Sequence, residues 1–293
     1  KKCINKKTNN TFDTTRILGI IAATHGAEDY LSYTIPKIVK QINESGFNAD
    51  IIIGLNNGFE CPAVVDKIAS TSESQIIHLY TTTKIDRAIP TIIFDNVELN
   101  GQPYRIKEYG HKLIKNRIFF IHQKNGVHSQ GKVRILLDIY QLLLDSIAVG
   151  WIPPLFTLTF DAETMFLIDV QDGKIDIESN GLGLLIKEIV SNSEIDILGT
   201  RLRNALYSKQ VTTDGAEIFL PEFSKLVPPI QLFVNFVHGK YKRYGVKPGG
   251  GTIGKTDVII SLLFVISKSY PGTIGEDVHA TILANHAGFN GDI

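Results

Sequence analysis

Short apolar runs alternate with segments of helical periodicity along this chain, and this alternation is the feature that most constrains its fold. Four of the runs indicate buried strands, at residues 16–24, 49–58, 74–83 and 153–169. After the first run, apolar side chains recur at helical spacing at Leu31, Ile35, Ile38, Val39 and Ile42. Strands that alternate with helices predict a mostly parallel central sheet with helices on both faces, which is the α/β class.

The rest of the chain continues this pattern, apart from one looser stretch. Further helices are predicted at residues 131–150, 183–192, 256–269 and 276–288, and a further strand at 195–204. Between residues 83 and 130 the pattern loosens, with a hairpin predicted around Asn100–Gly101 and one more strand at 118–123. No internal repeat or low-complexity linker interrupts the sequence. We therefore predict a flexible N-terminus at residues 1–15 and a single domain at 16–293.

Composition argues against several classes of protein. Thirty basic residues balance 30 acidic ones, so the chain lacks the net charge that binding to nucleic acid or to a membrane surface would use. Cys3 and Cys61 lie far apart, without the ligand spacing of a zinc site or the number that a disulfide framework needs. The longest apolar stretches, such as 258–266, are about half of the roughly 20 residues that a membrane-spanning helix requires. These features predict a cytoplasmic protein without a membrane span.

Two carboxylates stand where the fourth apolar run ends. Asp161 and Glu163, separated only by Ala162, follow the run LFTLTF. Ligands of parallel sheets bind at the carboxyl ends of the strands, and two carboxylates there can converge on a hard divalent cation such as Mg²⁺. The alternative is that these residues begin a helix, where acidic side chains complement the helix dipole.

The order of these segments resembles that of family 2 glycosyltransferases and their GT-A relatives, from about Ile17 to Gly288. The segments that carry the resemblance are the opening strand and nucleotide loop (20–35), the second strand and its turn (51–60), the Gly-Lys segment (131–144), the FDAET motif in the place of the family's DxD (160–164), and the Glu-Asp motif with its helix (275–289). The resemblance implies a GT-A fold. It also implies metal-dependent transfer of a sugar from a nucleotide-sugar donor to a sugar, glycan or small-molecule acceptor.

The resemblance also implies roles for individual residues. The metal ligands for Mg²⁺ or Mn²⁺ would be Asp161, Glu163 and His279. The contacts to the donor would come from Thr24, His25, Glu28, Asn56 and Asp161, with Lys132 at the diphosphate. If the reaction inverts the anomeric centre, Asp277 with Glu276 would take the proton of the acceptor hydroxyl, whereas a retaining reaction needs no such base.

Three features depart from the family pattern, and two of the implied site residues have simpler interpretations. Glu163 stands where the family's metal motif has a second Asp, and Asn56–Asn57 end the second strand where many relatives have an Asp. The stretch between residues 83 and 130 has the character of an insertion. Glu28 and Lys132 have ordinary alternatives, as a favourable charge in a first helical turn and as a surface lysine.

A second motif points to a different class of protein. Residues Gly249–Thr256, GGGTIGKT, fit the phosphate-binding loop of nucleotide-hydrolysing enzymes. That motif requires an apolar strand directly before the loop, but the preceding HGKYKRYGVKP is basic and broken by proline. Under the glycosyltransferase hypothesis, this stretch is instead a flexible loop that shapes the acceptor pocket. An NTPase and a catalytically silent nucleotide-sugar-binding domain are the two alternative functions.

Overall fold

The computed structural model describes part of the chain. The described residues are 12–23, 28–55, 62–72, 74–84, 91–94, 98–99, 102–103, 116–124, 132–148, 151–170, 174–176, 178–200, 206–211, 217–222, 251–269, 283–284, 287–289 and 291–292. Within them, no helix is long and apolar enough to cross a membrane.

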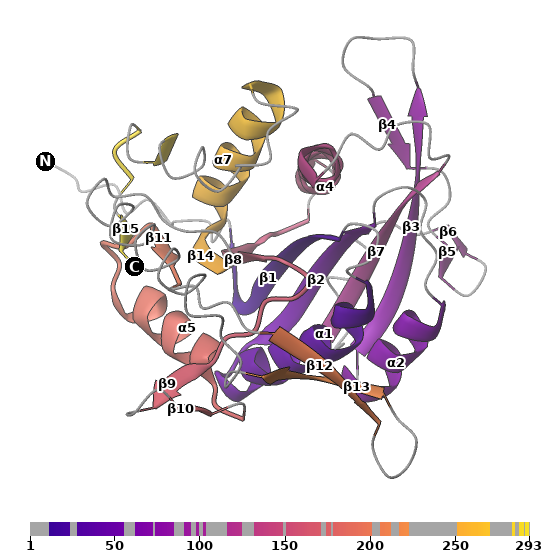
Figure 1. The fold of residues 1–293 in the computed structure, drawn as a ribbon. Coiled ribbons are helices and arrows are strands. Elements are labelled where there is room, and N and C mark those ends of the chain that lie inside the picture. The colour runs from indigo at the N-terminus through magenta and orange to yellow at the C-terminus, as the bar shows by residue number, and fades with distance from the viewer. Residues whose placement is uncertain are drawn as a thin grey trace, which may run out of the picture.

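Nine of the described strands form one sheet in the order β15-β11-β14-β8-β1-β2-β7-β3-β4 (Figure 1). Their bounds are β1 Asp13–Ala23, β2 Asn48–Leu55, β3 Ser74–Lys84, β4 Thr91–Phe94, β7 Asn116–Lys124, β8 Pro154–Phe160, β11 Ile197–Gly199, β14 Gly251–Lys255 and β15 Gly291–Asp292. The five strands from β8 to β3 run parallel to one another, whereas β14 runs antiparallel to both of its neighbours. The predicted mostly parallel sheet is therefore confirmed.

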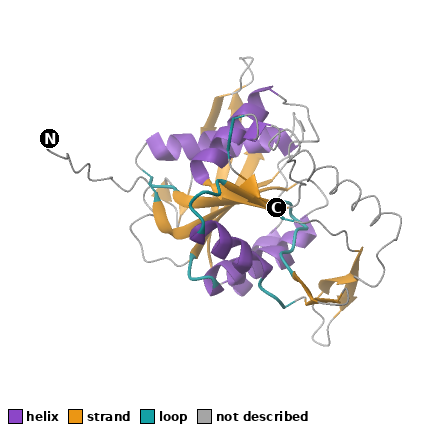
Figure 2. Ribbon diagram, turned by 90° about the vertical axis from the view of Figure 1, so that its left-hand side faces the viewer, coloured by secondary structure: helices purple, strands orange, loops and turns teal. Residues whose placement is uncertain are grey.

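Five described helices cover the two faces of this sheet (Figures 1 and 2). They are α1 Glu28–Glu44, α2 Pro62–Ser72, α4 Lys132–Ala148, α5 Gly181–Ser191 and α7 Thr256–Ser269. Side chains of β1 alternate between the faces, because successive residues of a strand point to opposite sides. Ile17 and Ile21 join the core beneath α1 and α5, while Leu18 and Ile20 join the core beneath α4 and α7. The predicted α/β class is confirmed.

Helix α1 shows how local sequence sets an element. Leu31, Ile35 and Ile42 are fully buried against the sheet, as their spacing predicts. The helix ends in a Schellman motif, in which the amide of Phe47 donates to the carbonyl of Ile42 at 3.2 Å. This motif needs a left-handed residue, and Gly46 occupies that position with φ 87°.

The looser stretch between residues 83 and 130 contributes two strands, β4 and β7, to the main sheet. β5 (Glu98–Leu99) and β6 (Gln102–Pro103) pair antiparallel on either side of Asn100–Gly101, so the predicted hairpin is confirmed. Strand β7, predicted at 118–123, inserts between β2 and β3 and pairs parallel with both. Strands β2 and β3, which follow each other in the chain apart from α2, are therefore not neighbours in the sheet.

Three small strand pairs complete the described elements. The antiparallel ribbons beyond the main sheet are β5–β6, β9 (Ile168–Val170) with β10 (Lys174–Asp176), and β12 (Leu206–Val211) with β13 (Glu217–Glu222). Leu283 and Ala284 are helical, and beyond them Gly288 has φ 78° and the amide of Phe289 donates to the carbonyl of Ala284 at 3.0 Å. These are the features of a helix C-terminus, as predicted at Gly288, whereas most of the predicted helix at 276–288 lies outside the described residues.

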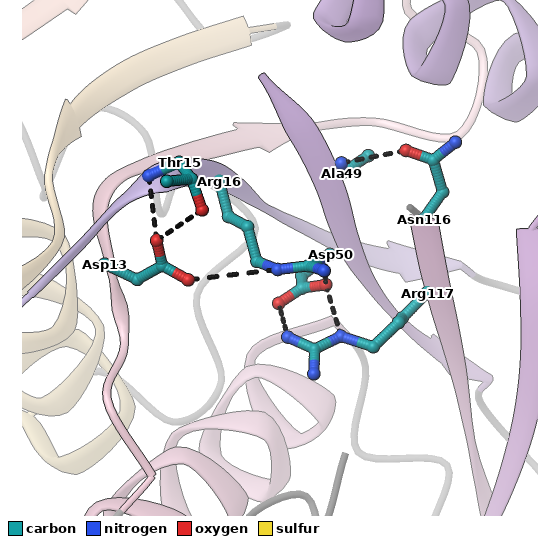
Figure 3. A network of polar contacts seen from close by, with 7 residues as sticks. All are labelled: Asp13, Thr15, Arg16, Ala49, Asp50, Asn116 and Arg117. Carbon is teal, nitrogen blue, oxygen red and sulfur yellow. Dashed lines mark hydrogen bonds and ion pairs between the residues drawn. The ribbon is translucent and has the colours of Figure 1, made fainter. Parts of the chain in front are cut away.

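A buried charge network ties the amino-terminal halves of three parallel strands together (Figure 3). Asp50 of β2 is 1% exposed and accepts hydrogen bonds from Arg16 of β1 at 2.8 Å and from Nε of Arg117 of β7 at 2.7 Å. A second contact joins Arg117 Nη2 to the other oxygen of Asp50. Such a network compensates buried charges, and it lies near the strand ends opposite to those where ligands bind in sheets of this kind.

Candidate functional site

The connectivity of the sheet places a topological switch point at one position on its carboxyl edge. From β1 the chain moves outward through β2 to β3, and β7 then inserts on that same side, whereas β8 returns to pair on the opposite side of β1. The strand order therefore reverses between β1 and β8. Ligands of open α/β sheets bind in the crevice at such a switch point, outside the carboxyl ends of the strands. Ile20 pairs with Thr159, so β1, which ends at Ala23, extends two residues beyond the end of β8 at Phe160.

Asp161 and Glu163 lie on a tight turn directly after β8, at this switch point. The amide of Thr164 donates to the carbonyl of Asp161 at 2.9 Å, and the amide of Asp161 donates to Oγ1 of Thr164 at 3.2 Å. Ala162 between them is 2% exposed, while Asp161 is partly exposed and Glu163 is exposed. The turn thus buries its alanine between two acidic residues that are less buried.

The alternative interpretation of this pair as a helix start is wrong. Residues 164–167 after the turn are not helical, and the next helix, α5, begins only at Gly181. A helix dipole therefore gives no account of Asp161 and Glu163. What remains is a pair of carboxylates separated by one residue at a strand end, which can supply oxygen ligands to a divalent cation.

Two buried aromatic side chains pack against each other beneath the turn. Phe160 and Phe166 are buried on either side of the turn and meet edge to face with ring centroids 6.1 Å apart. Gly251, the first residue of β14, pairs with Phe160 in the sheet. A Cβ at this position would lie 2.5 Å from the ring of Phe166, so the packing beneath the turn requires glycine there.

Helix α1 supports the turn from below through two buried polar side chains. Thr34 donates to the carbonyl of Ala162 at 2.8 Å, and Gln41 donates to the carbonyl of Phe166 at 2.8 Å. Neither residue was predicted from the sequence to belong to the site. A signal was present, because Thr34 and Gln41 are polar positions seven residues apart on the apolar face of an amphipathic helix, and buried polar groups need partners. Burial raises the pKa of Tyr33, which precedes Thr34 in the chain, and the negative charge of the nearby Glu178 raises it further. The phenol of Tyr33 is therefore neutral at neutral pH.

Several predicted donor contacts follow neighbouring strand ends at the same edge. β1 ends at Ala23 and β2 at Leu55, and these two residues are paired in register. Thr24, His25 and Asn56 come directly after them in the chain but lie outside the described residues, as do Glu276, Asp277 and His279. Glu28 and Lys132 are the first residues of α1 and α4, and their side chains are also outside the described part.

The start of α4 lies over the carboxyl end of β2. A Cβ added to Gly54, the penultimate residue of β2, would lie 2.1 Å from Cγ2 of Ile135 in the first turn of α4. Lys132 precedes Ile135 by three residues, so the backbone brings this predicted diphosphate contact to the same edge as Asp161. Among the described residues, no group of three His, Cys, Asp or Glu side chains could hold a metal ion. The complete predicted set of metal ligands stays a prediction because His279 lies outside them.

The structure corrects both interpretations of the Gly-rich motif. Gly251–Lys255 form β14, which pairs with β8 on one side and β11 on the other. A phosphate-binding loop needs free backbone amides directed at the phosphates, and a strand between two others uses its amides in the sheet. Thr256, which would bind Mg²⁺ in such a loop, is fully buried, and its hydroxyl donates to the carbonyl of Pro154 at 2.6 Å. This part of the motif is neither a phosphate-binding loop nor a flexible loop at an acceptor pocket.

We expect Lys255→Ala to leave ATP and GTP affinity undetectable, as in the parent protein, and to lower stability by about 1 kcal/mol. Lys255 donates to Asp196 at 2.7 Å and to the carbonyl of Ser193 at 2.9 Å, so its role is to join β14 to the start of β11. Isothermal titration calorimetry and urea unfolding test both parts, with Lys187→Ala on the exposed side of α5 as the matched control. Saturable ATP binding that disappears only in Lys255→Ala would contradict the assignment.

Comparison with known proteins finds similar structures but no similar sequence. No family model and no curated protein matches the sequence. A structure of 4-diphosphocytidyl-2C-methyl-D-erythritol synthase from Anaerococcus prevotii DSM 20548 is similar at 11% identity, with 96% of this chain and 89% of that chain covered and a TM-score of 0.38. Another structure of a 4-diphosphocytidyl-2C-methyl-D-erythritol synthase has the same identity and coverage, with a TM-score of 0.42. Similarities of this size do not bear on the chemistry of this chain, and membership of glycosyltransferase family 2 stays a prediction.

Proposed function

We propose that this chain is a metal-dependent glycosyltransferase of the GT-A type, which transfers a sugar from a nucleotide-sugar donor to an acceptor. The observation that carries the proposal is the pair Asp161 and Glu163 on a tight turn at the switch point between β1 and β8. A single domain over residues 16–293 and a cytoplasmic setting belong to the same proposal.

The chemistry of this pair fits a divalent cation bound together with a diphosphate. Mg²⁺ and Mn²⁺ prefer carboxylate and phosphate oxygens, and Mg²⁺ sites commonly use one or two protein carboxylates and leave the remaining positions to substrate and water. The exposed turn offers two carboxylates of this kind, and His279 is the proposed third protein ligand. When bound, the metal would act as a Lewis acid that offsets the charge developing on the leaving nucleoside diphosphate.

The chain's own residues would divide the remaining work. In the proposal, Thr24, His25, Glu28 and Asn56 bind the nucleotide, and Lys132 neutralises the diphosphate. Asp277, together with Glu276, removes the proton of the acceptor hydroxyl if the anomeric centre inverts. Two observations support this arrangement. Thr24, His25 and Asn56 directly follow β1 and β2, and Glu28 and Lys132 are the first residues of α1 and α4. The ends of β1 and β2 and the starts of α1 and α4 lie at the edge of the sheet where Asp161 lies.

Thermal unfolding in the presence of nucleotide sugars tests the proposed function. A ligand that binds only the folded state stabilises it by about 2.7 kcal/mol at a hundred times its Kd. We expect one nucleoside diphosphate sugar to raise the Tm with Mn²⁺ and much less with EDTA. Binding without turnover toward any acceptor or water would favour the silent binding domain, and no stabilisation by any nucleotide sugar would overturn the proposal.

We expect Asp277→Asn to keep donor binding and lose sugar transfer by about a hundredfold or more, because asparagine keeps the shape of the residue and removes its basicity. If Asp277 served only as a helix cap, its loss would cost about 1 kcal/mol and would spare turnover. Transfer rates and the donor-induced Tm shift, measured on the same preparation, separate the two roles. Transfer close to the parent rate would favour a retaining mechanism or a structural role.

A further inference from the structure

The turn that carries Asp161 and Glu163 is attached to α1 at two points. Thr34 is 1% exposed, and its hydroxyl lies 2.8 Å from the carbonyl oxygen of Ala162 and 3.0 Å from that of Tyr30. A threonine in a helix commonly bonds back to the carbonyl four residues earlier. Here the shorter contact goes to Ala162, beyond the last residue of β8, where the ladder with β1 and β14 has ended.

The second attachment lies two helical turns further along α1. Gln41 is 3% exposed, and its amide nitrogen donates to the carbonyls of Phe166 and Ser179, each at 2.8 Å. An amide nitrogen carries two hydrogens, so both are used. Residues seven apart in a helix lie on one face, about 10.5 Å apart along the axis. Thr34 and Gln41 therefore hold the two ends of the segment 162–166, which contains Glu163 and follows Asp161.

We propose that Thr34 and Gln41 are positioning residues that set the spacing of the two carboxylates for a divalent cation. This inference deepens the proposed function and rests on it for the identity of the bound ion. Thr34 holds the backbone between the two carboxylates, and Gln41 prevents the chain after Glu163 from moving away from α1. Partners outside the ligand shell orient ligands, and their loss typically lowers metal affinity by about 10- to 100-fold.

Two readouts test this proposal. The first is the Mn²⁺ concentration that gives half of the donor-induced rise in Tm. We expect Thr34→Val, which keeps the shape and removes the donor, to raise this concentration by about tenfold or more, while Thr34→Ser stays close to the parent. The second is amide hydrogen exchange at Thr164, whose N–H closes the turn onto the carbonyl of Asp161. We expect faster exchange in Thr34→Val, by about tenfold, and rescue in Thr34→Ser.

Thr157→Val is the matched control, because it also removes a buried threonine hydroxyl from a hydrogen bond. Thr157 is fully buried, and its Oγ1 lies 2.8 Å from that of Thr256, away from the turn. We expect this variant to change neither readout. If Thr34→Val does not fold, Gln41→Met provides the same two measurements from the other end of the segment, with the same expected direction.

The outcomes separate this inference from the proposed function. If the parent shows the Mn²⁺ effect and Thr34→Val and Gln41→Met match it in both readouts, the positioning role is wrong and the metal site stands. If no nucleotide sugar, tested together with Mn²⁺, raises the Tm of the parent protein, the proposed function is wrong. The proposed positioning of metal ligands is then wrong as well. Equal changes in Thr34→Val and Thr157→Val would show a general packing effect and overturn the specific role of α1.

Discussion

Asp161→Asn is expected to abolish metal-dependent binding of the donor and to lower sugar transfer by at least about a hundredfold. Loss of a residue that only orients a ligand typically costs about 10- to 100-fold in metal affinity or activity, so loss of a ligand itself should cost at least as much. Stability should change little, because Asp161 is partly exposed and the turn is closed by hydrogen bonds of its backbone carbonyl and amide. Mn²⁺ titrations of donor binding and initial transfer rates measure the effect.

The control for this substitution is Asp66→Asn on the exposed side of α2, which removes one charge at a distance from the switch point. We expect it to match the parent in both assays. Metal-dependent transfer by Asp161→Asn within about threefold of the parent rate would show that the metal does not bind at the end of β8. Glu163→Gln tests the second carboxylate in the same way.

Asp50→Asn is expected to lower the free energy of unfolding by about 3–5 kcal/mol, the cost of breaking a buried ion pair from one side. Asp50 is buried between two arginines, and the Arg117 side chain is only 3% exposed. Removing the carboxylate charge leaves Arg117 with an uncompensated buried charge. Its Nη1 already has no hydrogen-bond partner among the described residues, so the site has little capacity to compensate.

Urea unfolding with linear extrapolation measures this change. Asp13→Asn is the matched control, because Asp13 lies in the same network, 3.8 Å from Nε of Arg16, but is 30% exposed. Exposed ion pairs contribute at most about 1 kcal/mol, so we expect the control to lose no more than that. If Asp50→Asn unfolds at the same urea concentration as the parent, the network does not stabilise the fold.

The amount of structure that the sequence predicts depends on how local the signal is. Helix α7 was predicted at its observed bounds of 256–269, because its apolar periodicity is read within one segment. The hairpin at Asn100–Gly101 was predicted for the same reason. In contrast, Gly251–Lys255 fitted a local motif and became a strand, because its pairing with β8 joins segments more than 90 residues apart.

The candidate site also combines features that are local in the sequence with contacts between distant segments. The position of Asp161 and Glu163 after an apolar strand was visible in the sequence, and so was the expectation that they lie at the carboxyl edge of a parallel sheet. Their attachment to α1 through Thr34 and Gln41 was not, because each hydrogen bond joins residues more than 120 positions apart. The ion pairs of Asp50 were hidden for a similar reason, since its partners lie 34 and 67 positions away.

The sequence by itself therefore determined the α/β class, most of the helices and parallel strands, and the carboxylate pair at a strand end. These depend on side-chain periodicity and on turn residues, which act within a few positions of the chain. Only the tertiary structure decided the strand order, the insertion of β7, the identity of Gly251–Lys255 as a strand and the support of the turn by α1. Each of these depends on which distant segments pair once the apolar faces are buried together, and the periodicity of a single segment does not encode its partner.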